Sequence, residues 1–560
     1  MGFYLNSAGA HEMFCDDCAG TYYVDKSAIL NDLVPIVEMG ENLAVAAGGN
    51  GKKSIKYTCI TRPRRFGKTM MANMISAYFG RGADSSSQFA HMKASSCEWY
   101  QRHLNAHNVI HISFNDMPDE LTTYAQYIGR IKKMLLRDLQ MEYPDAGIES
   151  DDAVWDALTM VFEYCGREKF IFVLDEWDYI YHQRFVSDSD KESFTKFLSL
   201  LLKDRAYVEM AYMTGILPIA KYSSGSELNM FCEYTMATQA VYSEYFGFTD
   251  AEVDELYARY LMQDVSSNPR ILREDLRFWY DGYQTRSGIR VYNPRSVVYA
   301  LTNNQIDNYW TSSGPYDELF YYVGANVDEV KEPVGLMVAD LPVPAKVQDY
   351  AATSMELRTR DEIFSAMVVY GFLNYSDGCV SIPNRELMGK FSEMVKKEAS
   401  LGSVYQIAKE SERMLRATKA GDTKTMAEIL QFAHHTISPL NSYIHEAELA
   451  SMLRWIYLSA IETYRIERED RAGTGYVDYI FYPFRRDDDA LIIELKVDHT
   501  VDEAIEQIKD RQYVLRFMGK PGQKPEYTGR VLAVGIAYHR KDTAKRHECR
   551  VEVLRDKISL

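Results

Sequence analysis

A segment near the start of the chain constrains the fold more than any other. Lys56 to Ile60 reads as a short strand, and the loop from Thr61 to Thr69 ends in Gly-Lys-Thr. The helix-like run that follows places four apolar residues on one face, namely Met70, Met74, Ile75 and Phe79. Strand, loop, Gly-Lys-Thr and helix is the layout of a P-loop, which predicts an α/β domain.

The residue types of this loop suit phosphate binding. Backbone N–H groups of the loop and of the helix N-terminus, around Gly67, would face the phosphates. Lys68 would supply a point charge to the β/γ phosphates, and the Thr69 hydroxyl would hold Mg²⁺. The first glycine of the motif is replaced by Arg62, followed by Pro63. This departure predicts a loop that wraps phosphate less closely and leaves ATP turnover open.

A second element supports nucleotide binding. Phe170 to Leu174 is a continuous apolar run, as expected of a strand buried on both faces. It ends in the acidic pair Asp175-Glu176, which is the Walker B arrangement. Asp175 would hold Mg²⁺ through water, and Glu176 would polarise the attacking water. The alternative is a solvated pair of loop carboxylates, and the spacing from the P-loop favours the functional interpretation.

Further strands are expected at residues 109–114 and 208–214, where the sequences VIHISF and VEMAYMT are rich in apolar residues. Strands separated by helical stretches predict a parallel sheet. Thr214 ends the second of these strands. Two interpretations stay open for it: a polar residue near the γ-phosphate, or a simple strand-end threonine.

Seven motifs occur in one order along residues 20–310. They are YVDKSAIL (23–30), ITRPRRFGKT (60–69), VLDEWD (173–178), MTGI (213–216), FGFTDAEV (246–253), FWYDGY (278–283) and VYNPRSV (291–297). Together they resemble a bacterial AAA-ATPase-like family that is typically fused to a PD-(D/E)XK nuclease-like domain. The resemblance implies that an arginine-rich loop is usual at the position of Arg62. It also makes Arg64 and Arg65 candidates to face phosphate, with a solvated basic loop as the alternative.

The aromatic cluster at residues 278–283 has two interpretations, a docking surface or a packed corner, and the packed corner is favoured. Residues from about 310 to 435 show helical patterning, interrupted by a hairpin-like stretch at 374–382 and a polar turn at 419–424. No catalytic constellation stands out there. The region is expected to couple the two ends of the chain.

The end of the chain carries a second charged pattern. Residues 471–482 and 490–497 read as two strands joined by a polar turn. Asp478 lies on the first strand. Glu494 and Lys496 lie two apart on the second, so their side chains share one face. Burying these charges at the edge of a core is costly unless they bind a cation or pair.

Metal-assisted phosphodiester hydrolysis needs this set. Asp478 and Glu494 would supply oxygen ligands for Mg²⁺, and Lys496 would orient the water or stabilise developing charge. An Asp followed by E-x-K on the next strand resembles the PD-(D/E)XK nuclease superfamily, although Val477 stands where proline is common. The alternative is a surface ion-pair network on an amphipathic hairpin, and the order of helices and strands favours the nuclease.

Flanking helices agree with this resemblance. The helix at 445–461 would carry a metal-associated glutamate, either Glu446 or Glu448, since the register cannot be fixed by eye. The helix at 501–517 resembles the family pattern through Ala504, Ile508 and Tyr513, with Gln507 as an active-site polar group. A closing strand is expected at 530–538. Its basic flank would follow a phosphate backbone or form a solvated charged tail, and consists of Arg540, Lys541, Lys545, Arg546 and Arg550.

Composition bounds these expectations. At 560 residues the chain exceeds one core, and its net charge of −17 makes any nucleic-acid contact local. The eight scattered cysteines favour reduced thiols, and the Cys15-x-x-Cys18 pair beside His11 favours ordinary thiols over a zinc site. The sequence shows no signal peptide and no apolar run long enough to span a bilayer, which predicts a soluble cytoplasmic protein without membrane contact.

The prediction is therefore an α/β chain in three parts: a P-loop parallel-sheet ATPase domain at 20–250, a mostly helical connecting region at 251–435, and an α/β PD-(D/E)XK nuclease-like domain at 436–560. The predicted function is an ATP-gated nuclease using ATP and Mg²⁺, with Mn²⁺ as an alternative ion and DNA favoured over RNA. A nucleotide-regulated switch or scaffold with a vestigial nuclease site is the rival hypothesis. Assembly into a homo-oligomer and the processing of RNA or mobile elements stay open.

Overall fold

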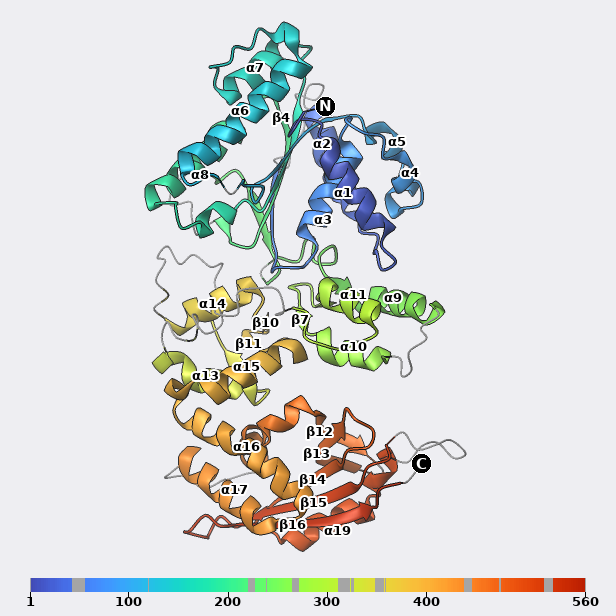
Figure 1. Ribbon diagram of the computed structural model, residues 1–560, viewed down its shortest axis with the longest axis vertical. Coiled ribbons are helices and arrows are strands. Elements are labelled where there is room, and N and C mark those ends of the chain that lie inside the picture. Colours follow the sequence, from blue (N-terminus) through green and yellow to red (C-terminus); the bar gives the residue numbers. More distant parts are fainter. Residues whose placement is uncertain are drawn as a thin grey trace. The chain divides into compact units, whose positions relative to one another are not determined.

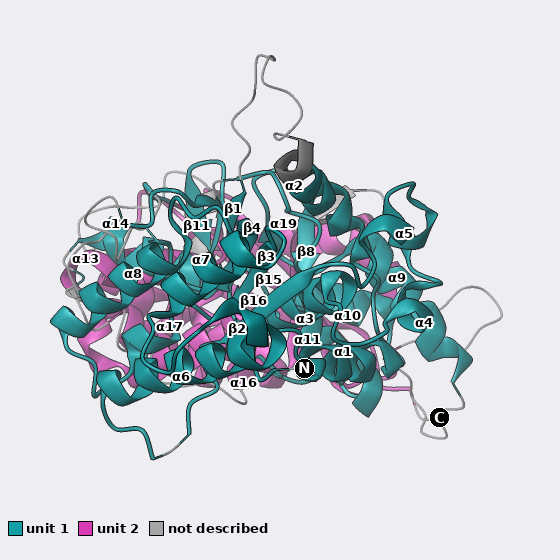
Figure 2. Cartoon of the chain, turned by 90° about the horizontal axis from the view of Figure 1, so that it is seen from above, with its two compact units in different colours: residues 1–322, 344–386 teal, residues 323–343, 387–560 magenta. Residues whose placement is uncertain are grey.

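The structure is a computed structural model (Figure 1). It describes residues 2–42, 56–118, 120–219, 227–237, 239–263, 271–310, 323, 327–347, 357, 359–437, 446–472, 475–517 and 527–558. The chain forms two compact units, which Figure 2 colours separately. Unit 1 comprises residues 1–322 and 344–386, and unit 2 comprises 323–343 and 387–560. The three-part division at residues 250 and 435 stays a prediction.

Unit 1 is built on a five-stranded sheet in the order β2-β3-β4-β1-β5. Every neighbouring pair in it is parallel, as the sequence predicts. The strands are β1 (Tyr57–Thr61), β2 (Asn108–Ser113), β3 (Phe170–Asp175), β4 (Val208–Gly215) and β5 (Cys232–Thr235). The carboxyl ends of all five therefore meet at one edge, which is where an α/β sheet binds its ligands.

Helices cover both faces of this sheet (Figure 1). One face carries α1 (Ala8–Ala19), α2 (Leu30–Asn42) and α3 (Lys68–Phe79), and the other carries α6 (Tyr124–Glu142), α7 (Val154–Tyr164) and α8 (Asp188–Leu202). The short helices α4 (Ser86–Phe89) and α5 (Tyr100–His103) follow α3. Because β3 and β4 are buried along their whole length, their apolar runs are explained by helices on both sides.

The rest of unit 1 follows β5. A small sheet in the order β6-β8-β7 joins β6 (Phe248–Thr249), β7 (Tyr283–Gln284) and β8 (Arg290–Tyr292). Around it lie α9 (Asp250–Met262), α10 (Arg273–Tyr280) and α11 (Pro294–Asn303). Later in the chain come α14 (Arg360–Tyr370) and the hairpin of β10 (Asn374–Ser376) and β11 (Cys379–Ser381). They are preceded by β9 (Val343–Pro344), whose first residue belongs to unit 2. The expected hairpin at 374–382 is present.

The aromatic cluster at 278–283 forms a packed corner. Tyr280 and Tyr283 are fully buried, and the Tyr283 hydroxyl donates to the Gly371 carbonyl at 2.8 Å. The Tyr283 ring also packs edge-on against Phe66 of the P-loop, with centroids 5.0 Å apart. Gly282 has φ +138°, and a Cβ there would collide with the backbone of Pro383. The motif therefore packs against the P-loop, in agreement with the favoured interpretation of a packed corner.

Unit 2 is built on a mixed sheet in the order β12-β13-β14-β15-β16. Its strands are β12 (Tyr464–Ala472), β13 (Gly475–Pro483), β14 (Ala490–Val497), β15 (Val531–Tyr538) and β16 (His547–Arg555). Among the described strand pairs of this sheet, only β14 and β15 are parallel. The helix α19 (Val501–Asp510) makes the crossover between them.

Alternating side chains divide this sheet into two faces. Leu491, Ile493 and Leu495 pack with the helices α16 (Ser403–Ala420), α17 (Thr423–Ile437) and α18 (Glu446–Ile456). Ala490 and Ile492 pack with α19 on the other face. Figure 1 shows α16 and α17 on one side of the sheet and α19 on the other.

Two further helices belong wholly or mostly to unit 2. In α13 (Val327–Val338), the Gly335 carbonyl accepts a hydrogen bond from the Trp455 indole at 2.7 Å. A Cβ on Gly335 would press on Val404 at 2.8 Å, so the helices lie close together there. The helix α15 (Arg385–Lys397) begins with two residues of unit 1 and continues in unit 2 from Leu387.

Several predicted boundaries in unit 2 are wrong. The strand expected at 471–482 is β13, and β12 precedes it without having been predicted. The helix expected at 445–461 ends at Ile456 and continues as a 3₁₀ segment, and the helix expected at 501–517 ends at Asp510. The stretch interpreted as a charged flank contains β16. The turn expected at 419–424 does separate α16 from α17.

Candidate functional site

The P-loop occupies the carboxyl edge of the unit 1 sheet, between β1 and α3. Gly67 takes φ +85° directly before the helix, with open space where a Cβ would lie. The buried Lys68 side chain turns back into the loop, and its Nζ donates to the carbonyls of Arg62 and Pro63, both at 2.9 Å. Burial lowers the pKa of Lys68, and nearby carboxylates oppose that shift. Thr69 is half-buried in the first turn of α3.

The Arg62 side chain extends from the P-loop toward β5 and does not fill the loop. Its guanidinium is buried and donates to the carbonyls of Thr61 at 2.8 Å and Tyr234 at 2.7 Å, and it lies over the Phe246 ring. Burial lowers its pKa to about 10. The arginine therefore joins the end of β1 to β5 and to the segment after it, which gives a structural reason for arginine where a glycine is usual.

The acidic pair stands at the end of β3, beside β4. Asp175 is fully buried, and its Oδ1 accepts a short hydrogen bond from the Thr214 hydroxyl. Its Oδ2 has no hydrogen-bond partner among the described residues. Glu176 is half-buried with φ +52°, and burial followed by the charge of Asp175 raises its pKa. A buried carboxylate oxygen without a donor fits a site that receives a cation.

Sequence reasoning missed the role of Asp178. This buried carboxylate accepts the backbone N–H groups of Ile216 and Leu217, at 3.1 and 2.9 Å, and so fixes the turn after β4. It is also the largest favourable charge acting on Lys68. Gly215 lies so close to Trp177 and Asp178 that a Cβ would fall 2.5–2.6 Å from their side chains. The second aspartate of the DEWD sequence was the available signal.

Arg64 and Arg65 are half-buried at the tip of the loop. The Arg65 guanidinium contacts the Tyr309 carbonyl at 3.4 Å and lies 5.8 Å from the Trp310 ring centroid. Arg64 lies 6.0 Å from the ring centroid of Tyr370. Both residues therefore rest on aromatic residues of unit 1, and their role toward phosphate stays a proposal.

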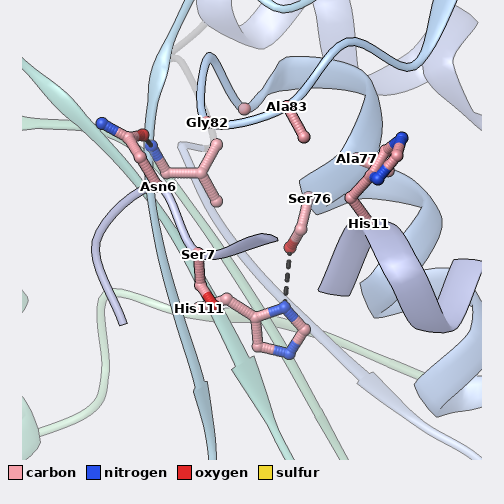
Figure 3. A pocket seen from close by; sticks show the side chains of 10 residues that line it. Asn6, Ser7, His11, Ser76, Ala77, Gly82, Ala83 and His111 are labelled. Carbon is pink, nitrogen blue, oxygen red and sulfur yellow. Dashed lines mark hydrogen bonds between the residues drawn. The ribbon is translucent and has the colours of Figure 1, made fainter. Parts of the chain in front are cut away.

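A small pocket lies beside α3 (Figure 3). His111 of β2 and Ser76 of α3 meet in it through a 2.9 Å hydrogen bond, which Figure 3 shows as a dashed line. Burial lowers the pKa of His111, and the Asp175 charge opposes that shift. The pocket is too narrow for a nucleotide, and its polar pair supports the helix that carries the P-loop.

In unit 2, the structure brings the predicted nuclease residues together on the α19 face of the sheet. Asp478 of β13 lies on the same face of the sheet as Ile480, two residues along the strand. Glu494 and Lys496 of β14 lie on the same face as Ile492. Lys496 Nζ donates to Glu494 Oε1 at 3.2 Å. Asp478 Oδ2 accepts the backbone N–H of Leu495 at 2.8 Å, which ties the two strands at the site.

Gln507 completes the group from α19. Its amide makes a short hydrogen bond to Glu494 Oε1, and its side chain also bonds the buried Tyr513 hydroxyl. Glu494 is 3% exposed, and its Oε2 has no partner among the described residues. Burial, and then the charge of Asp478, raise the pKa of Glu494 to about 7.

These residues fit a divalent cation. Glu494 Oε2 is a buried hard oxygen without a donor, and Asp478 supplies a second carboxylate on the same face. In the part of the chain that the structure describes, no three histidine, cysteine or acidic side chains form a complete metal-binding group. The side chains of Glu446 and Glu448, at the start of α18, lie outside the described residues.

Most of the basic flank is held in ion pairs. Arg540 pairs with Asp498 at 2.5 Å, Arg546 pairs with Asp542 at 2.8 Å, and Arg550 pairs with Asp502 and Glu552. Lys545 is buried, and Lys541 is exposed. A phosphate backbone would therefore have to compete with these carboxylates.

The thiols form no disulfide: all eight cysteines are free. Cys15 and Cys18 lie half-buried on α1, where the Cys15 sulfur approaches a His11 ring nitrogen at 3.6 Å. Across the described helices, none combines the length and apolar character needed to cross a membrane.

Comparison with known proteins matches two regions of the chain. Residues 51–224 match the family described as predicted AAA-ATPase, and residues 445–542 match the PD-(D/E)XK nuclease superfamily. The two regions stand in the expected order, so the resemblance is confirmed, while a bacterial origin stays a prediction. No curated protein matches the chain.

Similar solved structures include the Walker-type ATPase of Pyrococcus abyssi, at 12% identity and a TM-score of 0.33, covering 64% of this chain and 94% of that one. They also include the ORC2 protein of Aeropyrum pernix in ADPNP–ADP complexes, at 10% identity and a TM-score of 0.32, covering 66% and 94%. These scores are low, so the α/β assignment rests on the parallel strand order and the strand–loop–helix of the P-loop.

Proposed function

We propose that the chain is an ATP-gated, Mg²⁺-dependent nuclease that acts on DNA. The observation that carries this proposal is the buried Glu494, whose Oε2 has no donor while Asp478, Lys496 and Gln507 surround the same face of the sheet. A structural ion pair would leave no carboxylate oxygen unsatisfied in this position, because burial without a partner is costly. A bound cation removes that cost.

In the proposed reaction, Asp478 and Glu494 hold Mg²⁺, and Gln507 fixes the orientation of the Glu494 carboxylate. When bound, the ion would polarise the scissile phosphate and lower the pKa of a water. Lys496 orients that water or stabilises the charge that develops on the phosphate. The glutamate of α18, Glu446 or Glu448, is proposed as a further metal-associated group.

The nucleotide site is proposed at the P-loop. Lys68 would exchange the carbonyls of Arg62 and Pro63 for β/γ phosphate oxygens. Thr69 and Asp175 would hold the accompanying Mg²⁺, which the partnerless Oδ2 of Asp175 supports. Gly67 lets the backbone approach the phosphates, and Glu176 is the proposed group for polarising water.

Cleavage assays on single- and double-stranded DNA and RNA test the proposal. They compare wild type, Lys68→Ala and Glu494→Ala with Mg²⁺ or Mn²⁺, in the presence and absence of ATP. Glu506→Ala is a matched control, because this neighbour on α19 is exposed. Loss of DNA cleavage in Glu494→Ala, and loss of its ATP response in Lys68→Ala, is the expected result. Absence of metal-dependent cleavage on every substrate would overturn the nuclease.

A nucleotide-regulated switch with a vestigial nuclease site is the second candidate. The ion pairs of Arg540, Arg546 and Arg550 favour it, since they leave little free positive charge beside the site. In that case ATP binds through Lys68, hydrolysis is negligible, and Glu494→Ala keeps full biological activity.

A further inference from the structure

One buried glutamate of unit 1 belongs to none of the seven sequence motifs. Glu386 stands in the first turn of α15 and is 1% exposed. Its Oε1 accepts the backbone N–H groups of Tyr309 and Trp310, at 2.8 and 3.1 Å, and its Oε2 accepts the Ser296 hydroxyl at 2.8 Å. The carboxylate therefore fixes the segment that ends at Trp310.

Arg65 of the P-loop rests on this same segment. Its guanidinium contacts the Tyr309 carbonyl at 3.4 Å and the face of Trp310. Glu386 is the carboxylate that attracts it, and Arg64 and Arg295 are close enough to repel it. Arg65 therefore lies between the attraction of one buried carboxylate and the repulsion of two other guanidinium groups, at the edge of the sheet where nucleotide phosphates are proposed to bind. A group with this many positive neighbours is readily drawn to an added anion.

We propose that Glu386 is a positioning residue that competes with the nucleotide phosphates for Arg65, and so sets the affinity of the P-loop for ATP. The inference rests on the proposed nucleotide site. While Arg65 stays on the 309–310 segment that Glu386 holds, the loop lacks one phosphate-binding guanidinium. When a triphosphate draws Arg65 away, Glu386 loses a favourable charge. The attraction between Arg65 and Glu386 therefore weakens triphosphate binding. By thermodynamic linkage, triphosphate binding weakens that attraction by the same free energy.

The loss of that charge changes how tightly the Glu386 carboxylate holds a proton. Burial already raises the pKa of Glu386 to about 7, and the Arg65 charge is one of the influences that lower it. Removing a cation from beside a buried carboxylate raises its pKa further. Nucleotide binding near pH 7 is therefore accompanied by uptake of up to about half a proton from solvent onto Glu386.

The position of Glu386 in the chain gives this competition a route to the rest of the protein. Glu386 is the last residue of unit 1, and its helix, α15, continues into unit 2 without a break in the chain. A change in how Arg65 and the 309–310 segment hold this residue acts on the first turn of α15. A nucleotide-dependent signal therefore has a covalent path along one helix.

Calorimetry on the full chain tests the proposal, using Mg²⁺ with adenylyl imidodiphosphate in two buffers of different ionisation enthalpy at pH 7. Glu386→Gln keeps the shape and the acceptor oxygen but removes the competing charge. We expect it to bind the analogue about five- to tenfold more tightly than wild type. Arg65→Gln should bind more weakly, and Glu386→Gln should cause no further tightening in that background, because the competition has been removed.

Proton uptake supplies a readout that a purely structural role would not change. Wild type should take up more protons than Glu386→Gln at pH 7, with no difference at pH 5. Asp281→Asn is the matched control, since Asp281 is another buried carboxylate of unit 1, paired with Arg290. It should leave affinity and proton uptake unchanged.

The outcomes separate the two proposals. If binding depends on Lys68 but wild type and Glu386→Gln show equal affinity and equal proton uptake, the Glu386 inference is overturned alone. Tightening that persists undiminished with Arg65→Gln also overturns it. If the analogue fails to bind wild type, or binds Lys68→Ala equally well, the proposed nucleotide site is wrong and the inference fails with it. The wild-type proton measurement needs no variant to fold.

Discussion

Replacing Glu494 by glutamine should stabilise unit 2 at neutral pH while it removes a residue that the proposed cleavage needs. Burial, and then the Asp478 charge, raise the pKa of Glu494 to about 7 from an ordinary 4.5. The folded state therefore holds this proton more tightly than the unfolded chain does. The stabilising contribution is fully present below pH 4.5 and is lost as the pH rises through 7.

The size of the effect follows from the shift. At roughly 1.4 kcal/mol per pKa unit, ionisation of Glu494 costs the folded state about 3 kcal/mol above pH 7. Glutamine cannot ionise, and its amide oxygen can still accept from Lys496 and Gln507. We therefore expect Glu494→Gln to exceed wild type in unfolding free energy by about 3 kcal/mol at pH 8 and by about 1 kcal/mol at pH 5.

Urea unfolding measures this difference, with hydrogen exchange of β14 peptides reporting on unit 2 separately from unit 1. Glu506→Gln, an exposed neighbour, should match wild type at both pH values. Saturating Mg²⁺ should narrow the gap at pH 8, because the ion stabilises the ionised wild-type carboxylate. Equal stability of wild type and Glu494→Gln at pH 8, or a gap that does not shrink toward pH 5, would refute the reasoning.

Three further predictions follow from the described contacts. The Mg²⁺ concentration that half-saturates cleavage should rise about tenfold from pH 8 to pH 6, since the metal must displace the Glu494 proton; a pH-independent value contradicts this. Burial lowers the pKa of His547 to about 3, so its stabilising contribution is full above pH 6.5 and is lost as the pH falls toward 3; His547→Phe should flatten the acid limb of a stability profile measured by urea unfolding. Gly215→Ala should destabilise unit 1 by about 2 kcal/mol or more and weaken ATP binding, because its Cβ meets Trp177; unchanged melting of this variant would contradict the close packing.

The shared face of Asp478, Glu494 and Lys496 could be predicted because strand parity is a local property. An acid at 478 and the E-x-K of 494–496 fall on one face whenever the two strands pair in an ordinary antiparallel ladder. The P-loop and the acidic pair were predictable for a similar reason, since each follows a recognisable apolar strand.

The missed features depend on contacts between distant segments or on charge-rich strands. The sequences of β12 (YRIEREDRA) and β16 (HECRVEVLR) alternate apolar residues with many charges, as suits strands at the edges of a sheet. Their charges obscured the pattern. Glu386 and Asp178 act on backbone groups tens of residues away, and no local periodicity reveals such partners. The direction of the Arg62 side chain was hidden for the same reason.

The discontinuity of unit 2 has a consequence for biosynthesis. Its first piece, which contains α13, leaves the ribosome before residues 344–386 of unit 1 have been made. Gly335 is therefore synthesised well before Val404 and Trp455, the residues that it contacts in the folded unit. Each unit is thus unfinished while the other is being made, and no single cut in the chain releases an intact unit 2. A fragment starting near residue 445 would lack α13 and α15–α17, and so would expose the apolar face of its own sheet to water.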